Sequence, residues 1–205
     1  MLRKAVIIKM DTTRILELAK ENNGIVTTSM VIEAGISRGI LKYLVDIGKL
    51  ERSARGVYIL PGTWDDEFVN MQTRFKKGIY SHETALFLCD LTDRTPSSFN
   101  MVFPATYNLS GPKEFGIRCS SVREPLYSLG VVSMKTPAGN PVRCYCAERA
   151  LCDIMNRRSH TDIQIVADAF RRYTAGNEKN IMLLMDYADK LSVRNRIMAY
   201  LEVLL

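Results

Sequence analysis

The residues best suited to chemistry in this sequence are basic side chains spaced for contact with an anion. Arg38 and Lys42 are four residues apart, so they share one face of any helix that contains both, with Ser37 before them and Tyr43 beside them. Arg can donate two parallel hydrogen bonds to a guanine, while Lys and hydroxyl groups hold phosphates. This spacing predicts a DNA-reading helix, with Arg38 as its base-reading residue.

Four further residues could position such a helix on a DNA backbone. Arg52 and Arg55 flank the tip of an expected hairpin, and two guanidinium groups on a flexible hairpin suit contact with phosphates or the minor groove. Thr28 and Ser29 lie at an expected helix N-terminus, where hydroxyl and backbone N–H groups can bind a phosphate. The alternative for each cation is an ordinary solvated surface position. Their joint placement on one small module favours DNA binding.

The second half of the chain carries weaker signals of an enzyme. His82 and Glu83 could form an acid/base pair, but adjacent residues of a helix point about 100° apart. Glu148 and Asp153 could form an acidic site, but a separation of five residues favours fold-stabilising ion pairs with Arg. Glycine-rich phosphate loops, dinucleotide fingerprints and nucleophilic serine motifs are absent from the sequence. We therefore expect no catalytic residue and no cofactor.

The cysteines raise the question of a metal. Cys144, Cys146, Cys152 and His160 are close enough in sequence to suggest zinc, but they contain no C-x2-C pair. The chain has five cysteines, an odd number, and no secretion signal, so we expect free thiols, which commonly lie in the core. The expectation is that the protein binds no metal.

Helical periodicity places the basic residues in a small N-terminal module. The expected helices run from Asp11 to Asn22, from a cap within 27–29 to Gly35, and from a cap at Ser37 to Gly48. Two short helices joined by a glycine-containing turn are typical of a helix-turn-helix. A hairpin over 50–60 follows directly and ends at Pro61-Gly62, which predicts a wing. The alternative is a plain three-helix bundle with a hairpin packed against it.

Beyond Pro61-Gly62 the pattern changes to that of a mixed domain. Thr63 is expected to cap a helix that ends at Gly78, and a second helix begins at Ser81. Alternating residues then predict four short strands, and helical stripes follow from Ala147 to the end of the chain. The expected fold class is α+β, with a winged helix-turn-helix domain over 1–62 and a mixed domain over 63–205 that ends in a helical bundle.

Composition and charge agree with this division. The 205 residues are 47% hydrophobic and 24% charged, which excludes a largely disordered or collagen-like chain. The net charge is +6, and residues 1–60 hold 10 Lys and Arg against 6 Asp and Glu, which favours an anionic partner for the N-terminal module. Neither a signal peptide nor an apolar run of membrane length is visible, so we expect a cytoplasmic protein without a membrane partner.

Three stretches in this order resemble a known family, the AbiEi antitoxins of bacterial abortive-infection toxin–antitoxin operons. The resemblance covers nearly the whole chain. Its stretches are the wing strand Arg55-Gly56-Val57-Tyr58-Ile59-Leu60-Pro61, the opening of the second domain Ser81-His82-Glu83-Thr84-Ala85-Leu86, and the segment after the sheet Ala147-Glu148-Arg149-Ala150-Leu151-Cys152-Asp153.

The resemblance implies a type IV antitoxin that takes part in phage defence and represses its own operon by binding inverted repeats upstream. The partner gene encodes a nucleotidyltransferase-like toxin, which the C-terminal domain counteracts without a stable complex. The candidate residues for antitoxicity either act directly or build the fold. They are Ser81, His82, Glu83, Glu148 and Asp153.

Some alternatives stay open at this point. An antitoxin could instead neutralise its toxin by direct contact, with DNA binding secondary, and an enzymatic C-terminal domain is a third reading. Two symmetric half-sites need two winged modules, which could arrive as a dimer or as monomers that cooperate on the DNA.

Overall fold

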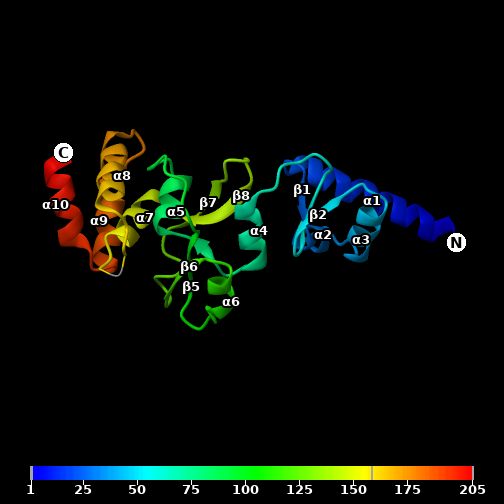
Figure 1. Ribbon diagram of the computed structural model, residues 1–205, viewed down its shortest axis with the longest axis horizontal. Helices are drawn as coiled ribbons and strands as arrows, with labels where there is room; N and C mark the ends of the chain where they lie inside the picture. The colour runs from blue at the N-terminus through cyan, green and yellow to red at the C-terminus, as the bar shows by residue number, and fades with distance from the viewer. Residues whose placement is uncertain (1, 158, 205) are drawn as a thin grey trace. The chain divides into compact units, whose positions relative to one another are not determined.

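The computed structural model describes residues 2–157 and 159–204, in two compact units (Figure 1). The first unit holds the chain up to Lys76 together with Lys135–Val142, and the second holds Lys77–Met134 and the chain from Arg143 onward. The packing boundary therefore lies after Lys76, whereas the sequence placed the domain boundary at Gly62. The assignment of separate functions to residues 1–62 and 63–205 stays a prediction.

The first unit begins with a winged helix-turn-helix, as the sequence predicted. Its elements are α1 (Leu2–Glu21), β1 (Ile25–Thr27), α2 (Thr28–Glu33), α3 (Gly39–Asp46), β2 (Glu51–Ala54) and β3 (Val57–Ile59). The three strands form an antiparallel sheet in the order β1-β3-β2. Strand β1 was not predicted, because its three residues are too few to show an alternating pattern.

A single hydrophobic cluster holds the three helices of this unit together. Its buried members come from α1, β1, α2, α3 and the segments that follow α2 and α3: Ile15, Ala19, Val26, Val31, Ile36, Leu41, Leu44 and Leu50. The i, i+3 spacing of Leu41 and Leu44 puts both on the inner face of α3. The opposite face of α3 is consequently left to its polar residues.

A fourth helix, α4 (Glu67–Arg74), completes the first unit. The expected cap at Thr63 was wrong: Asp66 caps this helix, because its Oδ1 accepts from the backbone N–H groups of Phe68 and Val69, at 3.0 and 3.3 Å. Val69 packs against buried residues of β1 and β3. These contacts explain why the compact unit extends past Gly62.

Asp66 also holds residues 135–142 in the first unit. Its Oδ2 accepts hydrogen bonds from Thr136 Oγ1 at 2.6 Å and from Asn140 Nδ2 at 2.8 Å. Asn140 in turn accepts from Asn23 Nδ2 at 3.1 Å. One buried carboxylate thus joins a helix cap to a hairpin tip about 70 positions further along the sequence.

The second unit is built on a five-stranded mixed sheet in the order β6-β5-β4-β8-β7. The strands are β4 (Ile79–Tyr80), β5 (Asn100–Pro104), β6 (Arg118–Val122), β7 (Val131–Lys135) and β8 (Pro141–Tyr145). Strand β4 pairs antiparallel with β5 and parallel with β8, while β5 and β6 are parallel. The four strands from β5 onward were predicted. The central β4 was not, because it has only two residues.

Helices interrupt and follow this sheet, which confirms the α+β class. They are α5 (His82–Leu88), the unpredicted short helix α6 (Ser110–Glu114), α7 (Ala147–Ile154), α8 (Ile163–Ala175), α9 (Ile181–Lys190) and α10 (Arg194–Leu204). The last four pack against one another (Figure 1). Over residues 2–157 and 159–204, none of the helices has the length and apolarity needed to cross a membrane.

Candidate nucleic-acid interface

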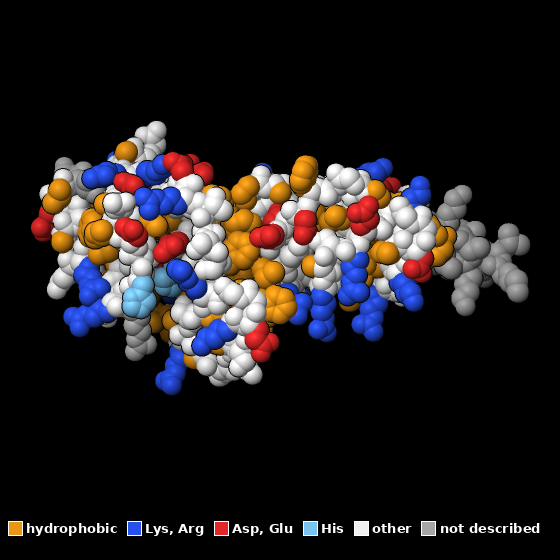
Figure 2. Space-filling view, viewed as in Figure 1, with side chains coloured by type: hydrophobic (Ala, Val, Ile, Leu, Met, Phe, Trp, Pro, Cys, Tyr) orange, Lys and Arg blue, Asp and Glu red, His pale blue; other side chains and the backbone are white. Residues whose placement is uncertain are grey.

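Helix α3 presents the predicted DNA-reading residues to solvent. Leu41 and Leu44 are buried, whereas Arg38, Lys42 and Tyr43 are exposed, with Tyr43 at 49%. Figure 2 shows Lys and Arg side chains projecting from the N-terminal unit on the side where Figure 1 places α2 and α3. The arrangement can offer cations, a phenol ring and hydroxyl groups to one anionic surface.

The N-terminus of α3 lies one residue later than expected, because Arg38 rather than Ser37 is the N-cap residue. The helix begins at Gly39, so Ser37 and Arg38 belong to the turn that precedes it. Arg38 has helical backbone angles, with φ −56° and ψ −21°, and Ser37 Oγ accepts from the Gly39 N–H at 3.4 Å. Arg38 therefore still stands at the N-terminal end of the second helix of the motif, where base-reading residues are found.

The wing carries Arg52 and Arg55 as predicted, and both side chains are exposed. Arg52 lies in β2 opposite Tyr58 of β3, and Arg55 lies at the hairpin tip beside Gly56. The tip turns through Gly56, whose φ of +81° favours a residue without a Cβ atom. The two arginines are thus presented by the first strand and by the tip of a tight hairpin.

The wing tip is anchored, which the expected flexible hairpin did not anticipate. The Gly56 carbonyl accepts from the Thr28 backbone N–H at 2.9 Å and from Thr28 Oγ1 at 3.4 Å. The Thr28 N–H is therefore already bonded within the protein. Thr28 joins the N-terminus of α2 to the wing, and the residue that caps α2 is Thr27, whose Oγ1 accepts from the Met30 N–H at 3.3 Å.

Ser29 is placed beside a cation that the sequence analysis missed. Lys76 Nζ donates to Ser29 Oγ at 2.6 Å, so a residue just after α4 reaches the first turn of α2. Lys76 is exposed and belongs to the same compact unit. It was missed because it follows the expected boundary at Gly62. The full candidate interface is Thr28, Ser29, Ser37, Arg38, Lys42, Tyr43, Arg52, Arg55 and Lys76.

The five candidate antitoxicity residues separate into two groups in the second unit. His82 and Glu83 line a cavity of about 490 Å³ together with His160, so both histidines of the chain face the same cavity. His82 has a φ of +49°, a conformation that is costly for a residue with a Cβ and is enriched at functional sites. Its Nδ1 lies 3.0 Å from the hydroxyl of Ser81, which is itself fully buried.

Glu148 and Asp153 are buried in contacts that build the fold. Glu148 Oε1 accepts from the Tyr173 hydroxyl at 2.9 Å, and Asp153 Oδ1 accepts from Arg149 Nε at 2.9 Å. Arg149 is only 1% exposed, and its Nη1 donates to the carbonyls of Leu126 and Leu129, at 2.7 and 3.1 Å. Arg149 was not among the residues predicted from the sequence, although both acids were.

Burial disfavours ionisation of three of the five cysteines. All five are free, and burial raises the pKa of Cys146 to about 12 and raises the pKa of Cys144 and Cys152 as well. These thiols stay protonated at neutral pH, so they are poor nucleophiles. Within the described parts of the chain, no three His, Cys, Asp or Glu side chains lie close enough to hold a metal ion.

The chain is similar to one protein family over part of its length and to a solved structure. No curated protein matches the chain. A crystal structure of the RV2827C protein from Mycobacterium tuberculosis is similar with a TM-score of 0.48 and 16% sequence identity, over 94% of this chain and 81% of that one.

The family match covers residues 14–61 and is described as "Transcriptional regulator, AbiEi antitoxin". The matched segment includes the larger part of α1 and all of α2, α3 and the wing. The N-terminal segment of the chain, residues 14–61, thus matches the AbiEi antitoxin family of transcriptional regulators.

Proposed function

We propose that the protein is an antitoxin that represses its own toxin–antitoxin operon by binding inverted repeats upstream of it. The observation that carries the proposal is the exposed basic face of α3, next to a wing whose tip is fixed to α2, within the segment that matches the family. A fixed wing holds its cations in register with α3, so both can meet one DNA duplex at the same time.

Each candidate residue takes a distinct role in this proposal. Arg38 reads a base edge in the major groove, with Lys42, Tyr43 and Ser37 beside it. The pair formed by Ser29 and Lys76 contacts a backbone phosphate. Arg52 and Arg55 contact further phosphates from the wing, and Thr28 positions the wing tip. Two half-sites require two copies of the chain on one operator, either as a dimer or as cooperating monomers.

Binding to the DNA upstream of the gene, compared with scrambled DNA of equal length over a salt series, tests this role. Sequence-selective binding that persists at physiological salt supports repression. Arg38→Ala should cost about 1–3 kcal/mol of specific binding and relax sequence preference, whereas Arg55→Ala should weaken all binding and reduce the salt slope by about one. Arg171→Ala is the control, because Arg171 is an exposed residue of α8. Equal, salt-sensitive binding to both DNAs would refute the proposal.

We further propose that the C-terminal domain counteracts a nucleotidyltransferase-like toxin without a stable complex, as in a type IV system that contributes to phage defence. Among the five candidates, His82 and Glu83 are the ones favoured to act directly, because they are half-buried and line a cavity, whereas Glu148, which lines another cavity, is buried. Ser81, Glu148 and Asp153 are favoured to build the fold, because they are buried.

Growth of cells that express the toxin, with and without this protein, tests the antitoxin role. His82→Ala and Glu83→Ala should abolish rescue without lowering the melting temperature, whereas Asp153→Asn should affect rescue only as far as it destabilises the protein. Co-purification of toxin and antitoxin at moderate salt would instead favour direct neutralisation, in which DNA binding is secondary. Full rescue by His82→Ala and Glu83→Ala would exclude the cavity from the activity.

A further inference from the structure

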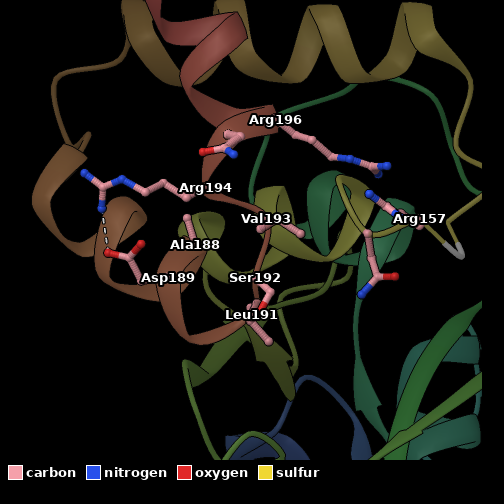
Figure 3. A pocket seen from close by; sticks show the side chains of 10 residues that line it. Arg157, Ala188, Asp189, Leu191, Ser192, Val193, Arg194 and Arg196 are labelled. Atoms are coloured by element: carbon pink, nitrogen blue, oxygen red, sulfur yellow. Dashed lines mark hydrogen bonds and ion pairs between the residues drawn. The ribbon is translucent and has the colours of Figure 1, made fainter.

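A second cavity in the C-terminal unit is lined by several arginines. It has a volume of about 710 Å³ and is formed by the segment after α7 and the connection between α9 and α10 (Figure 3). Among the described residues that line it are three arginines, Arg157, Arg194 and Arg196, and a single acid, Asp189. The side chains of these lining residues therefore carry a net positive charge.

The structure holds two of these arginines in place. Arg196 Nη1 donates to the Met155 carbonyl at 2.8 Å, and Arg194 Nη1 pairs with Asp189 Oδ2 at 2.6 Å. In Figure 3 the side chains of Arg157 and Arg196 extend toward the same side of the cavity, while Arg194 extends toward Asp189 on the other side. Cations thus approach the cavity from more than one direction.

The backbone beneath them is well defined. Two residues after the end of α9, Ser192 has a φ of +58°, and the Val193 N–H donates back to the Ala188 carbonyl at 2.9 Å. This closure is a helix C-terminal motif that fixes the start of α10 relative to the end of α9. The side chains that line the cavity therefore rise from a rigid turn.

Without a bound anion, the positive charges of these arginines repel one another and the N-terminal end of the α10 dipole. Arg194 and Arg196 lie in the first turn of α10, where the helix dipole disfavours positive charge, and Arg157 adds a like charge nearby. Asp189 compensates for one of the three charges. An anion in the cavity would relieve the remaining repulsion.

We propose that this cavity binds phosphoryl groups of a ligand that carries more than one phosphate. Guanidinium groups match phosphate oxygens with paired hydrogen bonds, and cations on different sides of the cavity suit an extended polyanion. Asn156 and Ser192 add neutral donors at the same cavity. Its volume lies within the range of small-molecule sites. A free polyphosphate and the backbone of a nucleic acid offer the same chemistry. The site uses none of the residues assigned to DNA reading or antitoxicity above.

Calorimetric titration of the full chain with inorganic pyrophosphate in 150 mM NaCl (about physiological ionic strength) tests the proposal. We expect one saturable site per chain. Arg157→Gln should weaken binding roughly tenfold, the usual loss for a hydrogen bond to a charged group, and Arg196→Gln should do the same. Asp189→Asn should strengthen binding, because it removes the acid that neutralises Arg194. Arg171→Gln on α8 and Arg38→Gln in the winged module should bind as the unaltered chain does.

The outcomes that would overturn the proposal are specific. Pyrophosphate that fails to bind, or that binds Arg157→Gln as tightly as the unaltered chain, excludes the cavity as a phosphate site. Loss of binding in Arg38→Gln assigns the anion to the winged module instead. If the cavity binds pyrophosphate, the same variants are then titrated with ATP and with a short single-stranded oligonucleotide. The true ligand, a free polyphosphate or a nucleic acid, binds more tightly than pyrophosphate, and Arg157→Gln weakens its binding.

Discussion

Replacing Arg149 with Met should destabilise the protein more than any single change at its surface. The guanidinium of Arg149 is buried, pairs with Asp153, donates to two backbone carbonyls and lies over the Tyr145 ring with its Cζ atom 4.3 Å from the ring centroid. A Met side chain fills much of the same volume but makes none of these polar contacts. The substitution therefore leaves an acid and two carbonyls without their partner inside the C-terminal unit.

The size of the effect follows from these contacts. Removing one member of a buried ion pair costs about 3–5 kcal/mol, and the loss of a hydrogen bond from a charged donor to a half-buried carbonyl adds about 1.5–3 kcal/mol. We expect a loss of at least about 5 kcal/mol, which is comparable with the whole stability of an ordinary domain. In the double variant Arg149→Met/Asp153→Leu the unpaired carboxylate is also removed. It should therefore recover about 2–4 kcal/mol of the loss.

Urea unfolding followed by circular dichroism measures both variants against the unaltered chain. Asp153→Asn is the milder comparison: it removes the charge that pairs with Arg149, but it also replaces Asp153 Oδ2, a buried oxygen with no hydrogen-bond partner within the described structure. Its cost should be about 1–2 kcal/mol. The reasoning fails if Arg149→Met costs less than 1 kcal/mol, or if the double variant is less stable than Arg149→Met alone.

Other variants test the remaining structural features. Gly56→Ala and Gly62→Ala both place a Cβ at a φ of +81°, so each should lose about 1 kcal/mol, but only Gly56→Ala should weaken DNA binding, because Gly56 forms the wing tip. Equal DNA affinity of the two variants would exclude a role for tip geometry. Asp66→Ala should lower the free energy of unfolding by about 2–4 kcal/mol in a thermal or urea melt, because it removes a helix cap and two buried hydrogen bonds. Asp162→Ala is the control: it removes the exposed cap of α8 and should lower the free energy of unfolding by about 1 kcal/mol. Stability should also fall between about pH 9 and pH 12: unfolding releases Cys146 to an ordinary thiol pKa of about 8.5, so above that pH the unfolded chain loses the proton that the folded chain keeps. The urea midpoint should therefore decrease over this range, and Cys146→Ala should decrease less steeply; an identical slope in both proteins would contradict the assignment.

The winged module could be predicted because its signals are local. The spacing of Leu41 and Leu44, the glycine at the hairpin tip and the basic residues of α3 are all readable over a few positions. The family resemblance drawn from the same region is confirmed by the match over residues 14–61. The predicted helix boundaries were less accurate. Asp66 rather than Thr63 caps α4, because Thr136 and Asn140, far along the chain, hold the Asp66 carboxylate in place.

The features that escaped prediction depend on contacts between distant segments. Strand β4 has two residues, and its place at the centre of the sheet is set by β5 and β8 rather than by its own pattern. Lys76 reaches Ser29 across 47 positions, and His82 meets His160 only in the folded chain. The arginines of the larger cavity likewise come from two segments that no local periodicity connects.

The hydrogen bonds from residues 135–142 to Asp66 also limit how the gene can recombine. The chain passes between its two compact units three times, after Lys76, Met134 and Val142. A single crossover in the gene between the codons for Asp66 and Thr136 would separate Asp66 from Thr136 and Asn140, its hydrogen-bond partners. We therefore expect the two halves of such genes to be inherited together, so that the proposed operator preference and the proposed C-terminal activity evolve as a linked pair.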